Sequence, residues 1–315
     1  MAYKIFIDGK EGTTGLRIAE RFQHRSDIEI LEIPEEKRKD TEERRKYINA
    51  SDYTFLCLPD AAAVEAVSLV ENEHTKIIDA STAHRTNPAW TYGLPELSPE
   101  QRAAVAASKR TAVPGCYASG FNTLMYPMVK SGLIAPYHPV TCHAVSGYSG
   151  GGKKLIAAYD DENRDSGFDG TRMYSLGKTH KHIKEMMAVS GLSYPPVFCP
   201  MTADFYNGMV VCVPIILRTM AKKADPHDIW EMLSAHYEGQ RFVKVMPFCA
   251  EGMPEETALF ADAVADTNML QIFVYGNDDH ALLVSRLDNL GKGASGAAVQ
   301  CMNIMMGIDE GTGLE

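Results

Sequence analysis

The 315-residue sequence lacks three features, and each absence excludes a class of protein. Its longest run of large apolar residues, positions 209–217, is interrupted by Pro214, whereas a membrane-spanning helix needs about 20 such residues. It begins without a basic region followed by an apolar one, so we expect no secretory signal and a cytoplasmic protein. It has no excess of basic residues, since its formal net charge is −10. Nucleic acids and anionic membranes bind basic surfaces, so neither is expected as a partner.

The seven cysteines form no CxxC pair and show no repeated spacing. An odd number without a framework indicates reduced thiols and argues against a structural zinc site, so we expect no metal. Six cysteines lie in apolar or proline-flanked contexts that are typical of inert, buried thiols: Cys57, Cys142, Cys199, Cys212, Cys249 and Cys301.

The first third of the chain alternates short apolar strands with helical segments. Strands are expected at residues 3–7, 28–33, 53–58 and 76–80, and helices at residues 14–24 and 61–70. Such alternation produces right-handed βαβ crossovers and a parallel, Rossmann-type α/β sheet.

After about residue 139 the expected strands become longer, with fewer helices between them. They cover residues 140–145, 208–218, 241–246, 268–275 and 280–288. This pattern predicts a second domain with a largely antiparallel or mixed sheet. A helix rich in small residues is expected at 295–306 and suits close packing on another element.

Gly9, Gly12 and Gly15 stand between the first expected strand and the first expected helix. Backbone N–H groups in such a turn can approach a pyrophosphate, and the helix directs its positive end toward it. A turn that merely begins a helix is the alternative, but the flanking elements favour nucleotide binding. Glu32 near the end of the second expected strand would favour NAD, whereas the run Glu36-Lys-Arg-Lys39 would favour NADP, and the residues leave both open.

Cys116 differs from the other cysteines because it follows Pro114 and Gly115 in a turn directly before a helical stretch. A thiolate at a helix N-terminus is stabilised by the helix field and can be a nucleophile near neutral pH. In a nucleotide-binding fold, this combination indicates hydride transfer to a thioester formed on the cysteine.

His180 and His182 lie in a segment, residues 172–184, that also carries four basic residues in an acidic protein. The segment is either a solvated basic helix face or a wall that recruits an anion and holds a proton donor. His84 is interpreted as a surface histidine. The glycine-rich segment 144–154 either lets a ligand approach the backbone or forms a loose surface loop.

Together these motifs resemble the N-acetyl-gamma-glutamyl-phosphate reductase family, in its shorter form, over almost the whole chain. The most specific pieces are YGLPEL at residues 92–97 and PGCYAS at residues 114–119. The resemblance also includes the glycine loop, residues 77–85, 145–147 and 174–185, and NLGKGASGAAVQ at residues 289–300.

The resemblance implies a Rossmann-type dinucleotide-binding domain, residues 1–115 completed by 292–315, and an inserted α+β domain, residues 116–291, for catalysis and oligomerisation. It implies reduction of N-acetyl-L-glutamyl 5-phosphate to N-acetyl-L-glutamate 5-semialdehyde with NADPH, in arginine biosynthesis, by a homo-oligomer. The alternatives are another acyl-phosphate or semialdehyde dehydrogenase, such as the aspartate-semialdehyde type, and a non-catalytic nucleotide-binding regulator.

The resemblance also implies roles for particular residues. Cys116 is the implied nucleophile, and His180 and His182 supply acid/base and substrate contacts, with His182 favoured as the proton shuttle. The implied cofactor-binding residues are Gly9, Gly12, Thr13, Thr14, Gly15, Ser146, Gly147 and Asn289. The implied substrate-binding residues are Tyr174, Arg85 and Arg172, with Arg164 as a further candidate for the substrate carboxylate.

The chain departs from the family pattern at three places. After the paired histidines it reads Ile183-Lys-Glu185, where longer relatives often have a proline before the acid. Ser119 stands where many members have threonine, and Lys10-Glu11 stand in the phosphate loop where others carry smaller residues.

Overall fold

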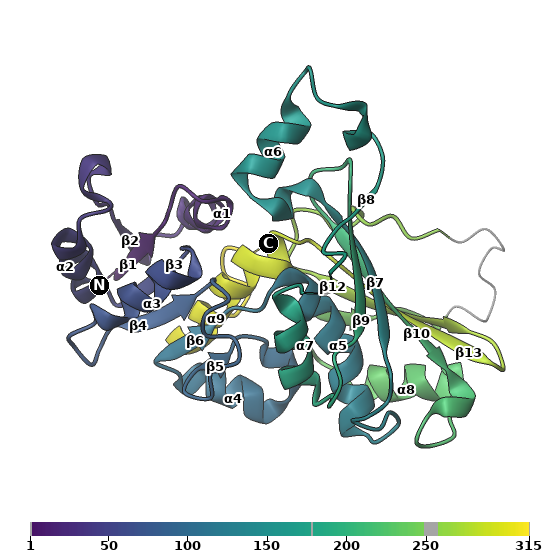
Figure 1. The fold of residues 1–315 in the computed structure, drawn as a ribbon. Helices are drawn as coiled ribbons and strands as arrows, with labels where there is room; N and C mark the ends of the chain where they lie inside the picture. Colours follow the sequence, from purple (N-terminus) through teal and green to yellow (C-terminus); the bar gives the residue numbers. More distant parts are fainter. Residues whose placement is uncertain (1, 178, 249–257, 315) are drawn as a thin grey trace. The chain divides into compact units, whose positions relative to one another are not determined.

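The computed structural model describes residues 2–177, 179–248 and 258–314. The chain forms two compact units, which we call unit 1 (Met1–Gly115 with Ala294–Glu315) and unit 2 (Cys116–Gly293) (Figure 1). Unit 2 is thus an insertion in the sequence of unit 1. No helix in the described part of the chain is long and apolar enough to cross a membrane.

Unit 1 is built on a six-stranded sheet, sheet A, in which all pairings are parallel. In the order β2-β1-β3-β4-β6-β5, the strands are Ile28–Leu31, Tyr3–Asp8, Tyr53–Leu56, Lys76–Asp79, Arg110–Ala112 and Thr91–Tyr92. The order reverses at β1, because β2 lies on one side of it and β3 on the other. Open α/β sheets bind ligands at the carboxyl ends of strands beside such a reversal.

The helices of unit 1 begin and end close to their expected positions where they were predicted. They are α1 Thr13–Phe22, α2 Thr41–Ala50, α3 Asp60–Ser68, α4 Pro99–Ala107 and α9 Gly296–Met306, with short 3-10 turns η1 Glu35–Lys37 and η2 Pro95–Leu97. The small residues of α9 allow it to pack against α4, β4 and α1. Gln300 Nε2 donates to Glu96 Oε1 at 2.7 Å, which ties α9 to the segment before α4.

Unit 2 is built on a seven-stranded mixed sheet, sheet B, in the order β11-β12-β13-β10-β7-β9-β8. The strands are Val243–Val245, Leu270–Gly276, His280–Leu287, Met209–Ile216, Thr141–Gly147, Val197–Ala203 and Arg172–Met173. The β11-β12 and β7-β9 pairs are parallel and the others antiparallel. The predicted fold class, a Rossmann-type parallel sheet with an inserted α+β domain of mixed sheet, is confirmed.

Strand β9 was not predicted, although it lies inside sheet B between β7 and β8. It contains Pro200, which lacks the N–H group that an internal strand normally donates. The proline therefore obscures an alternation of buried and less buried residues that otherwise marks a strand.

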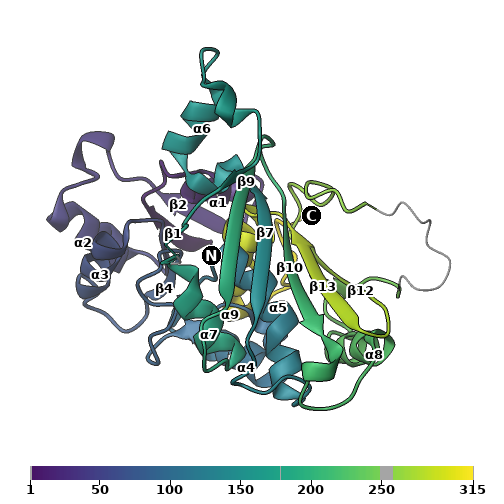
Figure 2. The same cartoon turned by 45° about the vertical axis from the view of Figure 1, so that its right-hand side comes forward.

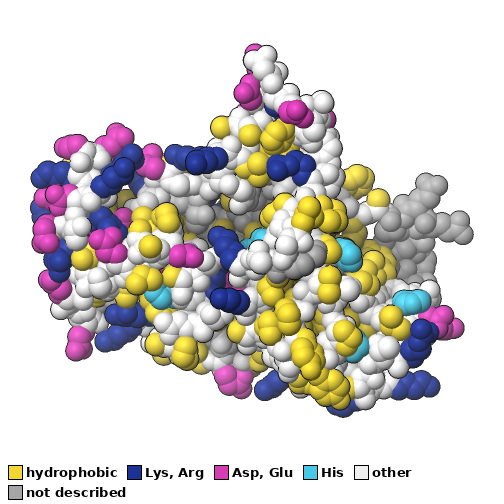
Figure 3. All heavy atoms as spheres, in the orientation of Figure 1, with side chains coloured by type: hydrophobic (Ala, Val, Ile, Leu, Met, Phe, Trp, Pro, Cys, Tyr) yellow, Lys and Arg dark blue, Asp and Glu magenta, His cyan; other side chains and the backbone are white. Residues whose placement is uncertain are grey.

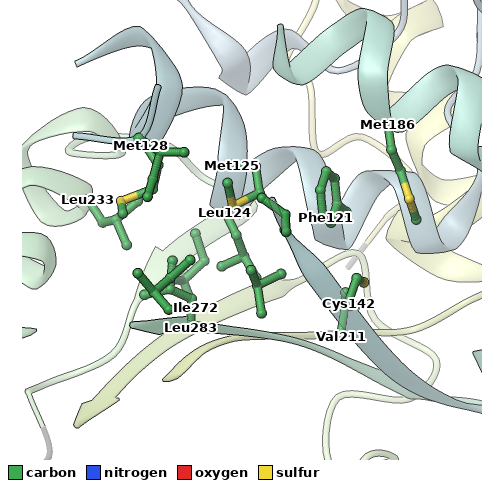
Figure 4. Close-up of a cluster of buried hydrophobic side chains, with 14 of the residues drawn as sticks. Phe121, Leu124, Met125, Met128, Cys142, Met186, Val211, Leu233, Ile272 and Leu283 are labelled. Atoms are coloured by element: carbon green, nitrogen blue, oxygen red, sulfur yellow. The ribbon is translucent and has the colours of Figure 1, made fainter. Parts of the chain in front are cut away.

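The helices of unit 2 are α5 Cys116–Lys130, α6 Lys153–Asp160, α7 His182–Ser190 and α8 Pro226–His236. The short turns of the unit are η3 Tyr148–Gly151, η4 Ser166–Phe168 and η5 Leu217–Thr219, and the π-type turn η6 Gly291–Ser295 begins in unit 2 and ends in unit 1. Figure 4 shows the core in which helix and strand side chains meet, including Phe121, Leu124, Met125, Met128, Cys142, Met186, Val211, Leu233, Ile272 and Leu283.

Helix α5 lies unusually close to sheet B. A Cβ atom at Gly120 would lie 2.6 Å from Ser285 Oγ and 2.7 Å from a side-chain carbon of Val211. Because the core also holds the buried residues Phe121 to Met125, the first turns of α5 have little freedom to move. Cys116, the first residue of this helix, is therefore attached to a fixed element.

The two units differ in their surfaces. In Figure 3, side chains of both charges gather over α2 in unit 1, whereas hydrophobic side chains are more frequent over unit 2. Figure 2 shows β7, β10 and β13 from a side that no helix covers. Exposed apolar side chains on sheet B include Val197 and Ile216, with 52% and 41% of their surface accessible.

Candidate active site

The glycines of the first loop are required by the way the backbone turns from β1 into α1. Gly9 has a φ of +85°, and a Cβ atom there would lie 2.4 Å from the carbonyl oxygen of Cys57. A Cβ atom at Gly15 would lie 2.6 Å from the carbonyl oxygen of Gly9. Gly12 is the N-cap of α1, with no side-chain cap and no acidic residue in the first turn. Uncapped N–H groups at a helix start are suited to binding an anion.

Two cavities open beside this loop at the carboxyl ends of β1 and β3. The smaller, of about 160 Å³, is lined by Gly12, Thr13, Thr14, Cys57, Leu58 and Ala80. The larger, of about 420 Å³, extends from Gly9 toward Glu32 at the end of β2. A glycine-rich turn between a first strand and a helix, with a cavity beside it, is the arrangement in which Rossmann-type folds bind dinucleotides.

The larger cavity has cations and acids in its wall. Lys10, Arg38 and Lys39 are the cations. Lys10 Nζ lies 2.5 Å from Glu32 Oε1, so the acid that would favour NAD is neutralised by an ion pair. Arg38 lies 3.8 Å from Glu35, another residue of the wall.

Cys116 is partly exposed at the start of α5. The turn after β13 packs directly against it, because a Cβ atom at Gly293 would lie 2.7 Å from the Cβ atom of Cys116. No side chain from residue 293 separates the backbone of the turn from the cysteine.

Four rings gather around the start of α5. The ring centres of His180 and His182 are 4.7 Å apart, and they lie 5.7 and 5.9 Å from the ring centre of Tyr117. Tyr174 donates a hydrogen bond of 3.1 Å to the Tyr117 hydroxyl. The structure thus brings the paired histidines and Tyr174 to the residue that follows the candidate nucleophile.

His180 is held in its neutral form. Burial lowers the pKa of His180 to about 4, and the neighbouring Lys181 adds to the effect. Its Nδ1 atom accepts the backbone N–H of His182 at 3.2 Å, so the neutral ring carries its proton on Nε2. His182 is buried at the start of α7, so this segment is more than a solvated basic face. Lys178, one of its basic residues, lies outside the described residues.

The glycine-rich segment after β7 is anchored rather than loose. The Gly147 N–H donates to the carbonyl of Gly208 at 2.9 Å. A Cβ atom at Gly147 would lie 2.4 Å from the carbonyl oxygen of Tyr206, so only glycine fits there. Ser146 and Ser149, on either side of it, are buried.

Asn289 lies beside this segment with both ends of its side-chain amide engaged. Its Oδ1 atom accepts the N–H of Gly208 at 2.8 Å, and its Nδ2 atom donates to Ser149 Oγ at 2.8 Å. The residues Ser146, Gly147 and Asn289, which were named together from the sequence, therefore belong to one local structure.

The three candidate arginines have different surroundings. Arg164 is bound to Asp169 at 2.8 Å and to Asp204 at 2.6 Å. Arg85 lies in unit 1 and donates to the carbonyl of Ala80 at 3.0 Å. Arg172 forms no ion pair with any residue that the structure describes, and its guanidinium lies over the ring of Phe168 at 5.0 Å.

Sequence reasoning missed a buried pair at the end of β4. His84, expected at the surface, is buried with its Nδ1 atom 2.7 Å from Asp79 Oδ2. Ser81 donates to the same oxygen at 2.7 Å, and the His84 ring stacks on Trp90 at 4.0 Å. The short D-x-S-x-x-H spacing was the available signal, but it does not reveal burial.

The interpretation of six cysteines as buried filler is correct for Cys142 and Cys301. It is wrong for Cys57, Cys199 and Cys212, which are partly exposed because Cys57 borders the cavities and the other two face away from the core of unit 2. Cys249 lies outside the described residues.

Comparisons with known proteins place the chain among the semialdehyde dehydrogenases. Residues 4–105 match the semialdehyde dehydrogenase NAD binding domain, and residues 116–289 match the semialdehyde dehydrogenase dimerisation domain. Aspartate semialdehyde dehydrogenase from Francisella tularensis has the same fold, with a TM-score of 0.72 at 15% identity over 97% of this chain and 100% of that one. Aspartate semialdehyde dehydrogenase II from Vibrio cholerae gives a TM-score of 0.71 at 13% identity, covering 97% and 98%.

Relatives with higher sequence identity show which family within the semialdehyde dehydrogenases the chain belongs to. N-acetyl-gamma-glutamyl-phosphate reductase 2 of Nostoc sp. (strain PCC 7120) is 48% identical over 99% of both chains. The N-acetyl-gamma-glutamyl-phosphate reductase of Brucella ovis is 43% identical over 98% of this chain and 100% of its own. The chain belongs to the N-acetyl-gamma-glutamyl-phosphate reductase family, as the sequence motifs predicted. Its NAD binding domain supports a nicotinamide cofactor.

Proposed function

We propose that the protein reduces N-acetyl-L-glutamyl 5-phosphate to N-acetyl-L-glutamate 5-semialdehyde, releases phosphate and uses NADPH, in arginine biosynthesis. The observation that carries this proposal is a partly exposed cysteine at a helix start, next to a tyrosine that contacts two histidines, in a member of this family. Unit 1 is the dinucleotide-binding domain and unit 2 the catalytic domain in this proposal.

Cys116 is the proposed nucleophile. Its thiolate attacks the acyl carbon, the bond from that carbon to the phosphate oxygen breaks, and the acyl group remains on the cysteine as a thioester. The nicotinamide cofactor, when bound, supplies a hydride to the thioester carbon. The resulting oxyanion takes up a proton from the acid/base residue to give a thiohemiacetal. The same residue takes that proton back as the carbon–sulfur bond breaks, which releases the aldehyde and restores the thiolate.

His182 is the proposed proton shuttle, and His180 is proposed to position it. A base that works near neutral pH must change its protonation state there. The pKa of His180, about 4, keeps this ring neutral, and its Nδ1 atom is occupied by the N–H of His182. These two facts support His182 as the residue that exchanges the proton.

The cofactor site is proposed to follow the glycine loop. Gly9, Gly12 and Gly15 with the threonines at the start of α1, Thr13 and Thr14, would hold the pyrophosphate. The uncapped N-terminus of α1 and the cavity beside it fit this group. Ser146, Gly147 and Asn289 form the proposed contact region for the nicotinamide.

NADPH rather than NADH is proposed as the reductant. An acid at the end of β2 usually selects NAD by binding the ribose 2′-hydroxyl. Here Glu32 is paired with Lys10, while Arg38 and Lys39 also border the cavity. These cations would attract a 2′-phosphate.

Arg172, Tyr174 and Arg85 are the proposed substrate contacts. Arg172 is the preferred partner for the substrate carboxylate in unit 2, because Arg164 is already bound to two aspartates. Arg172 also lies two residues before Tyr174, which contacts Tyr117.

We further propose that the protein is a cytoplasmic homo-oligomer and that the uncovered face of sheet B is its interface. Val197, Pro214 and Ile216 are exposed on this face, and a second copy would bury them. The matched dimerisation domain supports this assignment. Light scattering after gel filtration should give more than one chain per particle, and Ile216→Asp should lower that number.

A spectrophotometric assay in the reverse direction tests the proposed function. Phosphate-dependent reduction of NADP+ is followed with N-acetylglutamate semialdehyde, and in parallel with aspartate semialdehyde and with NAD+. Turnover should be fastest with the first aldehyde and NADP+, and should cease without phosphate. Preference for aspartate semialdehyde would favour the related dehydrogenase activity, and nucleotide binding without turnover would favour a regulator.

A further inference from the structure

We propose that the turn after β13, residues 288–293, positions the thiol of Cys116, and that Asp288 and Gly293 are positioning residues for the reaction. This inference rests on the proposed role of Cys116 as nucleophile. The turn belongs to unit 2, as does the cysteine.

The contact between the turn and the cysteine leaves no room for a side chain. A Cβ atom at Gly293 would lie 2.7 Å from Cys116 Cβ and 3.2 Å from Cys116 Cα, whereas ordinary contact begins near 3.4 Å. The cysteine cannot move away easily, because the residues that follow it in α5 are fixed in the core. The position of the sulfur therefore depends on the path of the backbone at residue 293.

The buried Asp288 carboxylate determines that path. Its Oδ1 atom accepts the N–H groups of Leu290 at 2.7 Å and Gly291 at 3.0 Å, and its Oδ2 atom accepts the N–H of Asp266. The carbonyl of Asp288 also accepts the N–H of Gly293 at 2.9 Å. One residue thus shapes the turn from both its side chain and its backbone.

A chain of polar contacts connects the turn to the glycine-rich segment after β7, and all of its members except the exposed Asp266 are buried. Asn289 Nδ2 donates to Ser149 Oγ at 2.8 Å, Ser149 Oγ donates to Asn207 Oδ1 at 2.9 Å, and Asn207 Nδ2 donates to Asp266 Oδ1 at 3.0 Å. Asp266 returns to the turn through its hydrogen bond to Asp288. This closed arrangement, which we call the polar ring, ties the turn that packs against Cys116 to the segment that holds Gly147 and Ser149, because buried side chains that are hydrogen-bonded to one another have little freedom to move.

A small change at residue 293 should therefore affect the chemical step. A misplacement of about 1 Å at a reacting group can cost roughly 100-fold in rate. We expect Gly293→Ala to lower kcat about 10- to 100-fold and to leave the KM for NADPH within about twofold of the wild type. Asp288→Asn keeps the volume but loses the acceptor for the Asp266 N–H, and should lower kcat by a smaller factor.

The direct readout is the rate at which iodoacetamide alkylates Cys116, measured by peptide mass spectrometry across pH 5 to 10. This measurement requires neither substrate nor turnover, so it remains informative if the proposed reaction fails in the reverse assay. Both variants should alkylate Cys116 at an altered rate and with an altered pH midpoint. Gly170→Ala is the matched control, because a Cβ atom there would have no neighbour within 4 Å, and it should behave as the wild type.

Circular dichroism establishes that each variant is folded before these rates are compared. If Gly293→Ala does not fold, the alkylation rate and pH midpoint of Cys116 in Asp288→Asn test the proposal instead. Alkylation rates and pH midpoints within twofold of the wild type and the control, in every folded variant, would overturn the proposal. Altered alkylation in Gly293→Ala or Asp288→Asn, with an unchanged Gly170→Ala, supports it.

Discussion

In unit 1 the candidate pyrophosphate-binding residues form one continuous loop, whereas the candidate site residues of unit 2 come from separate segments. The loop of unit 1 depends on backbone geometry, as the φ of +85° at Gly9 illustrates. In unit 2, Cys116 begins α5, His182 begins α7 and Asn289 follows β13. Backbone recognition suits a phosphate-containing cofactor that many enzymes share, whereas side chains from several segments suit one particular reaction.

The largest expected effect separates chemistry in unit 2 from binding in unit 1. Cys116→Ala should lower kcat by about 10⁴-fold or more, because no thioester can form, while the Kd for NADPH changes less than about twofold. Steady-state assays and fluorescence titration measure the two quantities. Cys142→Ala, which removes a buried thiol from the same unit, is the control and should keep its activity. Turnover near the wild-type level in Cys116→Ala would rule out covalent catalysis.

Features that depend on neighbouring residues could be predicted from the sequence, whereas features that join distant segments could not. The glycine loop and the thiol of Cys116 were predictable because each depends on neighbours along the chain. The Lys10–Glu32 ion pair and the polar ring were not, because they join segments that are distant in the sequence. The Asp79–His84 pair is local, but its spacing does not reveal that both side chains are buried.

Strand boundaries show a similar limit. The strand expected at 28–33 ends at Leu31, and β9 was missed because Pro200 interrupts its pattern. The alternating first domain and the strand-rich second domain were nevertheless correct, because periodicity and element order are properties of the whole segment.

The next largest effect concerns the core of unit 2. Leu233→Ala on α8 should lower the free energy of unfolding by about 2–5 kcal/mol, because it removes a fully buried side chain and leaves a cavity. Glu231→Ala on the exposed face of the same helix is the matched control and should change stability by less than about 0.5 kcal/mol. Urea unfolding followed by circular dichroism compares the variants. Equal stability of the two would contradict the assignment of this core.

A smaller effect should appear in unit 1. Lys10→Ala removes the partner of Glu32 and leaves the acid close to a 2′-phosphate. We expect the ratio of kcat/KM for NADPH over that for NADH to fall about tenfold, because an unpaired carboxylate repels phosphate. Lys37→Ala is the control, because Lys37 pairs with Glu43 and is not part of the cavity wall. If the ratio is unchanged in Lys10→Ala, Lys10 does not contribute to the preference for NADPH over NADH.

The smallest effect is a pH dependence of stability in unit 2. The pKa of His180 is lowered from 6.5 to about 4 in the folded protein, so the unfolded chain binds more protons between these values. The contribution of His180 is therefore present above pH 6.5 and is lost as the pH falls toward 4. In His180→Gln the free energy of unfolding should decline less over this range, as urea titrations at several pH values would measure. Parallel declines in the two proteins would show that His180 is not held neutral.

Covalent attachment of the substrate to Cys116 is the central step of the proposed reaction. Mass spectrometry of the protein mixed with N-acetyl-L-glutamyl 5-phosphate, without NADPH, tests this directly. We predict one N-acetylglutamyl group per chain on the peptide that contains Cys116, and its release as the semialdehyde when NADPH is added. A wild-type protein that turns over the acyl phosphate but carries no adduct on this peptide, or carries it on another residue, would contradict the account.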